Sequence, residues 1–406
     1  MVNKLLKLPL YLTAFFPILF LTGTASADIG MSLIAICFLL HSWLEKDWAW
    51  TKALWVRTLG LLWIYMNIRG LFAEQPSEAL HRSLPFVRYF VFAAALAYWT
   101  LREKWVHETF LKVLASVVLL SSLDALLQWV HGTDLIGMPY KIDNNHIRLT
   151  APFRMQIVGI MLAWLSLPVC MLFIKNNEGR LKLDWKLLII LPVLVAIVLS
   201  GERMALLLTA AGWLMAVFML PVRKIYPLAA VIAGIAALGA LAYMSPVTFN
   251  RQIVSTVETL QNWQQSPYGI LLTSDLRVAQ VNPVFGIGTN HFRLECPKYF
   301  SGPLACNLHP HNIYLEWFIE QGFIGFILFL TFIYALLRAC VKNWQVVQQN
   351  PVCIGFLVAV LLRLWPLASS TGFFSRWGAP PFWLVIGALL VYITGNFKQN
   401  TSETSL

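Results

Sequence analysis

The chain has 406 residues, 58% of them hydrophobic and only 12% charged, with a formal net charge of +11. This length would suit two or three soluble domains, but apolar runs of about 20 residues exclude that organisation. The runs are continuous rather than alternating, so they also exclude barrel strands and predict an all-α polytopic membrane protein.

The first apolar run follows Lys4 and Lys7 and is similar to a cleavable signal peptide up to Ala27. First helices of polytopic proteins share these features, and we expect this one to be retained. Hydropathy then predicts about 12 transmembrane helices. In chain order they lie near residues 8–25, 29–44, 53–72, 85–101, 109–130, 154–174, 186–200, 204–220, 226–244, 312–338, 352–369 and 377–394.

These helices divide the chain into three parts and a tail. Residues 1–244 hold helices 1 to 9, residues 245–311 form one large loop, residues 312–394 hold helices 10 to 12, and residues 395–406 form a short tail. Lysines gather in the short connections on the side that also holds both termini. The positive-inside rule makes this side cytoplasmic, so the large loop faces the periplasm.

The outward side carries arginine rather than lysine. Arginine offers a rigid fork that binds phosphate or carboxylate bidentately and stays charged when partly buried. Lipid phosphates or neighbouring glutamates could account for any single one, but the whole set predicts an anionic substrate at the outer leaflet. The set comprises Arg69, Arg82, Arg88, Arg148, Arg154, Arg203, Arg251, Arg277, Arg293, Arg363 and Arg376.

A short polar break separates two apolar runs at Ser200-Gly201-Glu202-Arg203. A turn at the outer boundary would place Arg203 where a lipid diphosphate lies. The alternative is a plain hairpin turn that Glu202 and Arg203 solvate. We favour phosphate binding, because an arginine at a tight membrane turn is costly without a partner.

A second turn lies inside the large loop. Pro283, Gly286 and Gly288 suit a tight turn where the chain or a ligand must come close. Arg277 precedes this turn and Arg293 follows it. No strand–helix unit surrounds the glycines, which excludes a dinucleotide-binding loop.

The loop ends in His309-Pro310-His311-Asn312. Pro310 holds the backbone extended, and Asn312 is the expected N-cap of the next helix, whose positive end favours a phosphate. Histidine can take a proton near neutral pH, as activation of an acceptor hydroxyl requires. Loop hydration is the alternative and fits His309 better than His311. Glu316 could orient His311, line a water-filled entrance or pair with an arginine.

Cys296 and Cys306 both lie in the large loop, where an oxidising periplasm predicts a disulfide. Together with His309 and His311 they could instead hold zinc, but the spacing is not a standard one. We expect no metal and no cofactor, since arginines can neutralise a diphosphate without one. The other four cysteines lie in or beside helices and are expected to be packing residues.

Three stretches resemble the O-antigen ligase family of bacterial envelope enzymes, which is related to the O-antigen polymerases. His311-Asn312, nine residues and then Gly322-Phe-Ile-Gly325 match the family's H-N-x9-G-x-x-G pattern. Residues 200–205 are similar to its arginine turn, and residues 276–288 to its loop arginine with a following P-x-x-G-x-G turn. The chain departs from the family at Glu202, where a small or polar residue is more usual, and in the short spacing from Arg277 to Pro283.

The resemblance implies a GT-C-like, inverting, metal-independent glycosyltransferase of the bacterial inner membrane. It would move O-antigen polysaccharide from undecaprenyl diphosphate to a lipid A–core hydroxyl at the periplasmic face, in lipopolysaccharide biosynthesis. Arg203 and Arg277 would bind the diphosphate, His311 would activate or position the acceptor, and Asn312 would cap the helix or touch a sugar. Further substrate-binding candidates are Arg148, Arg154, Arg293, His309 and Glu316.

The expected partners are the lipid-linked polysaccharide, lipid A–core and membrane lipids, without nucleic acid. An O-antigen polymerase is the first alternative, but polymerases tend to carry two comparable arginine-rich outer loops, and the 130–153 loop is small. A transporter of lipid-linked sugars would need ionisable residues deep in the membrane, where Asp124 stands almost alone. A protein-directed oligosaccharyltransferase stays open, as do the glycan, the acceptor sugar and the oligomeric state.

Overall fold

The computed structural model describes residues 7–143, 146–177, 180–183, 190–221, 246–300 and 306–395, with isolated positions between 232 and 243. These residues are mainly helical, as an all-α membrane protein requires. Within them, the regular strands form two short antiparallel hairpins. These are β1 (Lys141–Asp143) with β2 (His146–Arg148), and β3 (Ile174–Asn177) with β4 (Arg180–Leu183).

The N-terminal helices follow the hydropathy prediction closely, except for the first. The run expected as one helix over 8–25 is broken, because Pro17 lies in a 3-10 turn (Phe16–Ile18) and Gly23 has a φ of 121°. The helices of this part are α2 (Leu8–Ala14), α3 (Leu19–Thr22), α4 (Thr24–Leu44), α5 (Leu54–Leu71), α6 (Pro76–Ser83), α7 (Val87–Tyr98) and α8 (Lys104–His131).

The rest of the chain is helical as well, including most of the described part of the large loop. The helix expected over 226–244 falls outside the described residues, apart from isolated positions. The remaining helices are α9 (Val158–Met171), α10 (Ile190–Leu199), α11 (Arg203–Met219), α13 (Pro246–Phe249), a π-helical turn (Asn250–Val254), α14 (Ser255–Gln261), α15 (Pro267–Ala279), α16 (Phe292–Glu295), α17 (Ile313–Lys342), α18 (Trp344–Gln349), α19 (Pro351–Arg363) and α20 (Ala379–Thr394).

Four described segments are long and apolar enough to cross a membrane. They are Thr24–Leu44, Pro76–Arg102, Lys104–His131 and Ile313–Lys342, and shorter apolar helices accompany them. Asp124, the ionisable residue that a transporter would need deep in the membrane, lies in the last third of α8. Its carboxylate accepts a hydrogen bond from the Leu135 N–H at 2.8 Å, so it holds the following connection in place.

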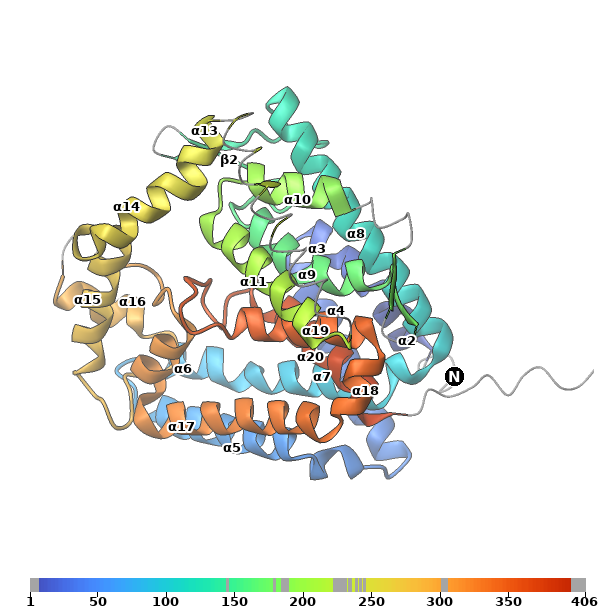
Figure 1. Ribbon diagram of the computed structural model, residues 1–406. Helices are drawn as coiled ribbons and strands as arrows, with labels where there is room; N and C mark the ends of the chain where they lie inside the picture. The colour runs from blue at the N-terminus through green and yellow to red at the C-terminus, as the bar shows by residue number, and fades with distance from the viewer. Residues whose placement is uncertain are drawn as a thin grey trace, which may run out of the picture.

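Small residues let the central helices approach one another closely, as is common in membrane bundles. α20 packs along α7, with Gly387 against Leu96, and α19 packs along α9, with Gly355 against Pro168. α5 and α17 run side by side at the edge of this core (Figure 1). The described residues of α9 and nearly all of α20 are buried, whereas α4, α5 and α17 keep exposed apolar side chains that suit a lipid-facing surface.

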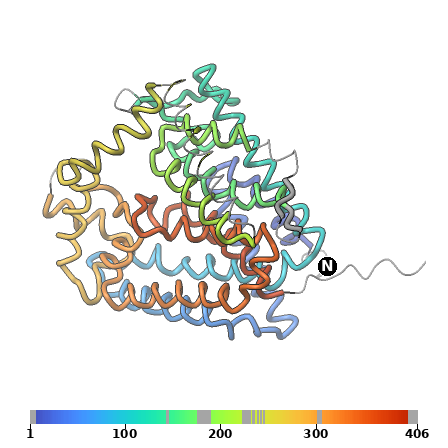
Figure 2. Tube along the Cα trace, in the orientation of Figure 1, coloured from blue at the N-terminus to red at the C-terminus, as the bar shows by residue number. Residues whose placement is uncertain are grey.

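Several connections assigned to the outward side meet at one end of the bundle, called here the outer end, with α6, α15 and α16 on the left of Figures 1 and 2. Arg69 of α5 donates hydrogen bonds from Nε and Nη2 to the Gly286 carbonyl, at 2.9 and 2.7 Å. The carbonyl of His311 accepts from the Ser370 N–H at 2.7 Å. At the other end, Arg102 donates to the Thr394 carbonyl at 3.1 Å, so the end of α20 lies against the α7–α8 connection.

Candidate functional site

Two of the sequence motifs meet backbone to backbone in this outer end. α17 is interrupted at Gly322, which has a φ of 65° and a ψ of −172°, so the carbonyls of Ile319 and Glu320 lose their helical partners. The P-x-x-G-x-G turn replaces those partners. Ile287 and Gly288 donate their N–H groups to these carbonyls at 3.0 and 2.9 Å. The turn therefore holds the first part of α17 at a fixed angle to the second.

The His309-Pro310-His311-Asn312 turn lies at the start of α17, as predicted. The Asn312 side-chain oxygen accepts from the N–H groups of Tyr314 and Leu315 at 2.9 and 3.2 Å, which confirms the N-cap prediction. Its amide nitrogen donates to the Pro366 carbonyl at 2.6 Å. The connection between α19 and α20 thus anchors both Asn312 and the backbone of His311.

The two histidines of this turn lie with their ring centres 5.1 Å apart. Asn307 donates from its amide nitrogen to Nε2 of His311 at 3.1 Å, which leaves the ring proton on Nδ1. Burial lowers the pKa of His311, and burial together with the charges of His311 and Arg363 lowers the pKa of His309 to about 4. Both imidazoles are therefore neutral at pH 7.

His311 and Asn312 line a largely apolar cavity of about 450 Å³, called here the apolar chamber. Its walls come from the start of α11, from α15, from the start of α17 and from residues 366–369. The lining residues are Met204, Leu260, Trp263, Tyr268, Leu271, Leu272, Asp275, His311, Asn312, Tyr314, Leu315, Pro366, Leu367, Ala368 and Ser369.

Arg203 stands at the rim of the apolar chamber, next to Met204. Its Nη1 donates to the Ser255 carbonyl at 2.8 Å and to the Thr259 hydroxyl at 2.9 Å. Its guanidinium carbon lies 5.8 Å from the centre of the Tyr268 ring, within reach of a cation–π interaction. These contacts hold the guanidinium beside the chamber.

On the other side of the histidine turn lie two adjacent cavities of about 200 and 250 Å³, which share Arg82, Phe374 and Arg376 and are together called the polar groove. Among the described residues, four buried nitrogens of its lining have no hydrogen-bond partner: Arg88 Nε, Asn290 Nδ2, Arg293 Nε and His309 Nε2. The other lining residues are Asp28, His81, Pro85, Arg88, Tyr89, Leu308, Glu316, Glu320, Gly372 and Ser375.

The two glutamates of the polar groove are buried and bound to the backbone. Glu316 accepts from the Phe373 N–H at 2.7 Å, and Glu320 accepts from the Asn290 N–H at 2.8 Å. A Cβ atom at Gly372 would lie 3.3 Å from Oε1 of Glu316 and 2.9 Å from the His309 ring, so these groups crowd one corner of the groove. Both carboxylates thus shape the groove through contacts with its connecting segments.

The structure brings most of the predicted site residues to these two spaces and leaves three outside. His311, Asn312 and Arg203 lie in or at the apolar chamber, and Arg293, His309 and Glu316 line the polar groove. Three arginines line neither space. Arg277 is exposed and donates to Gln280 at 3.2 Å, Arg148 packs against the Gly201 turn, and Arg154 is exposed with a φ of 58°.

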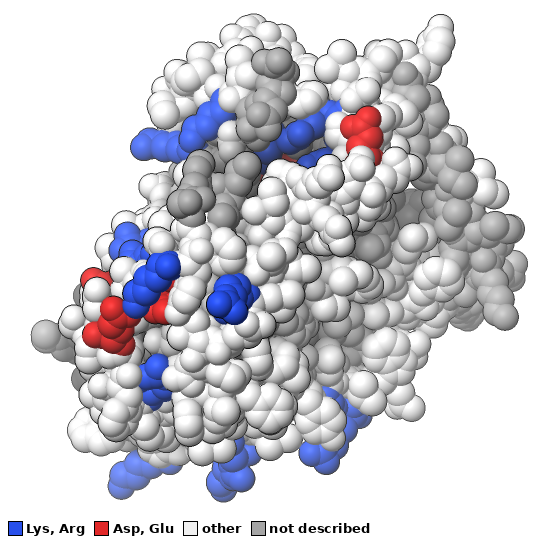
Figure 3. Space-filling model, turned by 90° about the vertical axis from the view of Figure 1, so that its left-hand side faces the viewer, with Lys and Arg blue, Asp and Glu red and all other residues white. Residues whose placement is uncertain are grey.

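Several of the arginines assigned to the outward side have protein partners. Such partners are the alternative explanation given above for any single arginine. Arg69 binds Gly286, Arg88 pairs with Asp28 at 3.3 Å, and the buried Arg363 donates to the Thr371 carbonyl at 2.9 Å. Even so, blue side chains are spread more widely than red ones over the face shown in Figure 3. Arg293 and Arg376 of the polar groove also pair with carboxylates, Glu78 and Asp28. The anionic-substrate prediction therefore depends mainly on Arg203 at the chamber and Arg82 in the groove, which form no ion pair among the described residues.

Glu202, the departure at the arginine turn, has a structural role in the fold. Its two carboxylate oxygens accept from the N–H groups of Gly159 and Ile160, at 2.7 and 3.2 Å, in the first turn of α9. A carboxylate at a helix start is favoured by the orphan N–H groups there. Burial raises the pKa of Glu202 to about 7.

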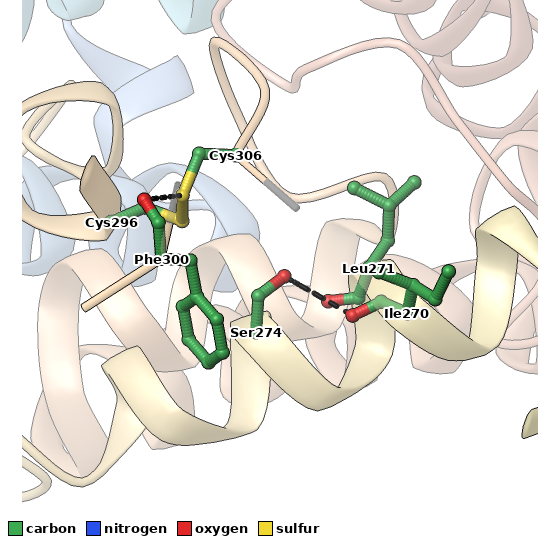
Figure 4. Close-up of a disulfide and its surroundings, with 6 residues drawn as sticks. All are labelled: Ile270, Leu271, Ser274, Cys296, Phe300 and Cys306. Atoms are coloured by element: carbon green, nitrogen blue, oxygen red, sulfur yellow. Dashed lines mark hydrogen bonds between the residues drawn. A yellow bond between two sulfur atoms is a disulfide. The ribbon is translucent and has the colours of Figure 1, made fainter. Parts of the chain in front are cut away.

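Cys296 and Cys306 form the predicted disulfide, with a Cα–Cα distance of 5.7 Å (Figure 4). Neither thiol is therefore free to bind zinc. Among the described residues, no group of three or more His, Cys, Asp or Glu side chains could hold a metal ion. Of the other cysteines, Cys170, Cys340 and Cys353 are buried and Cys37 is partly buried, as expected for packing residues.

Several residues of the two spaces were not singled out from the sequence. Trp263, Tyr268 and Asp275 line the apolar chamber, and Arg82 and Arg376 line the polar groove. The two arginines belonged to the outward set, but nothing local separated them from its other members. Asp275 carried no local signal, because only the orientation of α15 brings it to the chamber.

Residues 187–330 match a family model described as O-antigen ligase. No curated protein matches the chain. The matched segment runs from α10 to the middle of α17, so it contains Arg203, Asp275 and His311. The connection between α19 and α20, which contributes lining residues to both spaces, lies outside the matched segment.

Proposed function

We propose that this chain, whose residues 187–330 match the O-antigen ligase family model, is a membrane glycosyltransferase that attaches O-antigen to lipid A–core. The donor is polysaccharide on undecaprenyl diphosphate, and the acceptor is a core hydroxyl. The observation that carries the proposal is the apolar chamber, which His311, Asn312 and Tyr268 line together, with the Arg203 guanidinium over the Tyr268 ring. Such a site suits a lipid-linked anion.

The donor diphosphate lies at the rim of the apolar chamber in this proposal. Within the described part of the chain, the hydrogen bonds of Arg203 use Nη1, which leaves Nε and Nη2 for a phosphate. The Nδ1–H of His311 and the positive end of α17 are further donors toward developing negative charge. The apolar walls suit the first isoprene units or the sugar carbons of the donor.

The acceptor saccharide lies in the polar groove. Its phosphates and hydroxyls supply the hydrogen-bond partners that Asn290 Nδ2, Arg293 Nε and His309 Nε2 lack among the described residues. The reacting hydroxyl extends past the histidine turn into the chamber. Its oxygen attacks the anomeric carbon of the donor sugar, the bond to the diphosphate breaks, and the configuration inverts. The enzyme is thus a metal-independent transferase of the GT-C-like class.

The same proposal places the protein in the bacterial inner membrane, with both termini cytoplasmic and the two spaces periplasmic. The Cys296–Cys306 disulfide supports an oxidising compartment for the loop. The Arg102–Thr394 contact supports a common side for the end of α20 and the lysine-rich connections.

Complementation of a ligase-deficient strain tests the function. Wild type, His311→Ala and Arg203→Ala are compared at matched protein levels, with His131→Ala as a control at an exposed site outside both spaces. We expect wild type and the control to restore laddered lipopolysaccharide, and both site variants to abolish it while undecaprenyl-linked polymer accumulates.

Two other outcomes would change the assignment. If wild type complements only a polymerase-deficient strain, the glycosyl transfer stands but the acceptor is another lipid-linked glycan. If glycosylated protein forms instead, the acceptor is a protein. Failure in all three assays at normal expression would overturn the proposed function.

A further inference from the structure

Asp275 is a buried carboxylate that the described part of the protein does not satisfy fully. It lies on α15, is 3% exposed, and lines the apolar chamber together with His311. Among the described residues, its Oδ1 has no hydrogen-bond partner. A buried polar atom without a partner is unfavourable and rare in native proteins, so it calls for an explanation.

Other contacts hold α15 in place without Asp275. Ser266 caps the helix by accepting from the Gly269 N–H at 3.2 Å, and Pro267 occupies the first helical position. Val278 and Ala279 pack with Phe292, Ile319 and Cys296 in a separate apolar cluster beside the disulfide. Phe300 reaches toward α15 from the disulfide segment, near Ser274 (Figure 4). The position of α15 therefore does not depend on the carboxylate.

The transfer needs a proton acceptor, and His311 is poorly suited to be one. Its Nε2 already accepts from Asn307, and its Nδ1 carries the proton. The glutamates of the polar groove are engaged by the backbone N–H groups of Phe373 and Asn290. Among the described residues that line the apolar chamber, Asp275 is the only one with a carboxylate side chain.

We infer that Asp275 is the general base of the glycosyl transfer, an assignment that rests on the proposed function. One carboxylate oxygen takes the proton of the acceptor hydroxyl as the hydroxyl oxygen bonds to the anomeric carbon. The electron pair of the breaking carbon–oxygen bond leaves with the diphosphate. Arg203 and the Nδ1–H of His311 stabilise the new negative charge. Asp275 then passes its proton to water as the products leave.

The surroundings of Asp275 suit a base that works near neutral pH. The titratable or charged groups that face the chamber are Tyr268 from α15 itself, His311 and Tyr314 from the start of α17, and Arg203 at the rim. The residues from the α19–α20 connection add none. Burial raises the pKa of Asp275 to about 7, where general bases are most effective.

The test uses the purified full-length protein with a lipid-linked polysaccharide donor and a lipid A–core acceptor. Asp275→Asn and Asp275→Glu are compared with wild type for turnover, donor binding, melting temperature and the pH dependence of kcat. Asp134→Asn is the matched control. Asp134 is also buried, and its Oδ2 likewise has no partner among the described residues. It lies outside both spaces, and its Oδ1 accepts from the N–H groups of Ile136 and Met138 at 3.1 and 2.8 Å.

We expect Asp275→Asn to lower kcat by about 10²- to 10⁴-fold, the usual contribution of a general base. Donor affinity should be unchanged, and the melting temperature should be equal or higher, because an unpartnered carboxylate is removed. The rise of kcat with pH around 7 should disappear, and Asp275→Glu should restore part of the activity. Asp134→Asn should do the opposite, with lower stability and normal turnover.

The inference is overturned if wild type is active and Asp275→Asn keeps kcat within threefold. It is also overturned if activity, donor binding and melting temperature fall together in Asp275→Asn and in Asp275→Glu, since that pattern indicates a structural role. If wild type itself transfers nothing to any glycan, the proposed function fails and the base assignment fails with it.

Discussion

Gly286 and Gly322 face each other so closely that a Cβ on either would overlap the amide nitrogen of the other. Both have a positive φ, 77° and 65°, a backbone conformation that residues with a side chain rarely adopt. This contact joins the loop turn to the interruption of α17. It thereby fixes the angle between the two segments of α17. That angle sets the position of the histidine turn, at the start of the first segment, relative to the apolar chamber and the polar groove.

Gly322→Ala should therefore prevent stable folding of the outer end. The substitution adds about 1–2 kcal/mol of backbone strain and a steric clash with a backbone that has no room to move. Thermal unfolding in detergent should show a melting temperature several degrees lower, or too little folded protein to measure. Gly60→Ala is the control, because a Cβ there meets nothing within 4 Å. Equal melting of the two variants would contradict this account of the contact.

Arg203→Ala should lower kcat/KM by about 10²- to 10³-fold, as removal of a donor to developing charge typically does. Arg203→Lys should recover little, because lysine lacks the planar fork that binds Ser255, Thr259 and a phosphate together. The measurement is steady-state transfer with the lipid-linked donor.

Arg277→Ala should cost less than tenfold in the same assay. Arg277 is exposed at the end of α15 and lines neither the apolar chamber nor the polar groove. A loss as large as that of Arg203→Ala would show that α15 turns or shifts when the donor binds, and would confirm the catalytic role predicted for Arg277.

Arg82→Ala should raise the KM for the acceptor by about tenfold or more and leave the KM for the donor unchanged. Arg82 lines both cavities of the polar groove, and within the described residues it forms no ion pair, so a charged group of the acceptor is its expected partner. Arg57→Ala, at an exposed position on α5, serves as the control. A change in donor KM instead would mean that the groove holds the diphosphate.

Glu202 should make stability depend on pH. Its pKa is raised to about 7 in the folded protein, above the ordinary value of 4.5, so the folded state binds the proton more tightly than the unfolded state. Its contribution to stability is therefore fully present below about pH 4.5 and is lost as the pH rises to about 7. In Glu202→Gln this part of the pH dependence of the melting temperature should vanish. A profile identical to that of wild type would argue against a buried, protonatable Glu202.

Much of the outer end could be predicted because local rules determine it. Asn312 caps α17, Gly201 makes the turn before Arg203 with a φ of 73°, and the glycines of the loop turn permit a close backbone approach. Each of these features depends on residues adjacent in sequence. The disulfide followed from the compartment and the number of cysteines in the loop.

The assignment of individual side chains to the two spaces could not be predicted in the same way. Asp275 and Arg277 are two positions apart on one helix and so point about 200° apart, yet nothing in their own segment says which one faces the apolar chamber. The packing of Val278 and Ala279 on α17 decides it, and it turns Asp275 inward and Arg277 outward.

By itself, the sequence determined the helical class and the polar turns, because hydropathy, caps and glycine turns act over a few neighbouring residues. Only the tertiary structure decided which arginines bind other protein groups. It also decided that Glu202 binds the start of α9 and that Asp275 lines the same chamber as His311. Those outcomes depend on contacts between segments far apart in the chain, which are set by how helices pack and not by any local pattern.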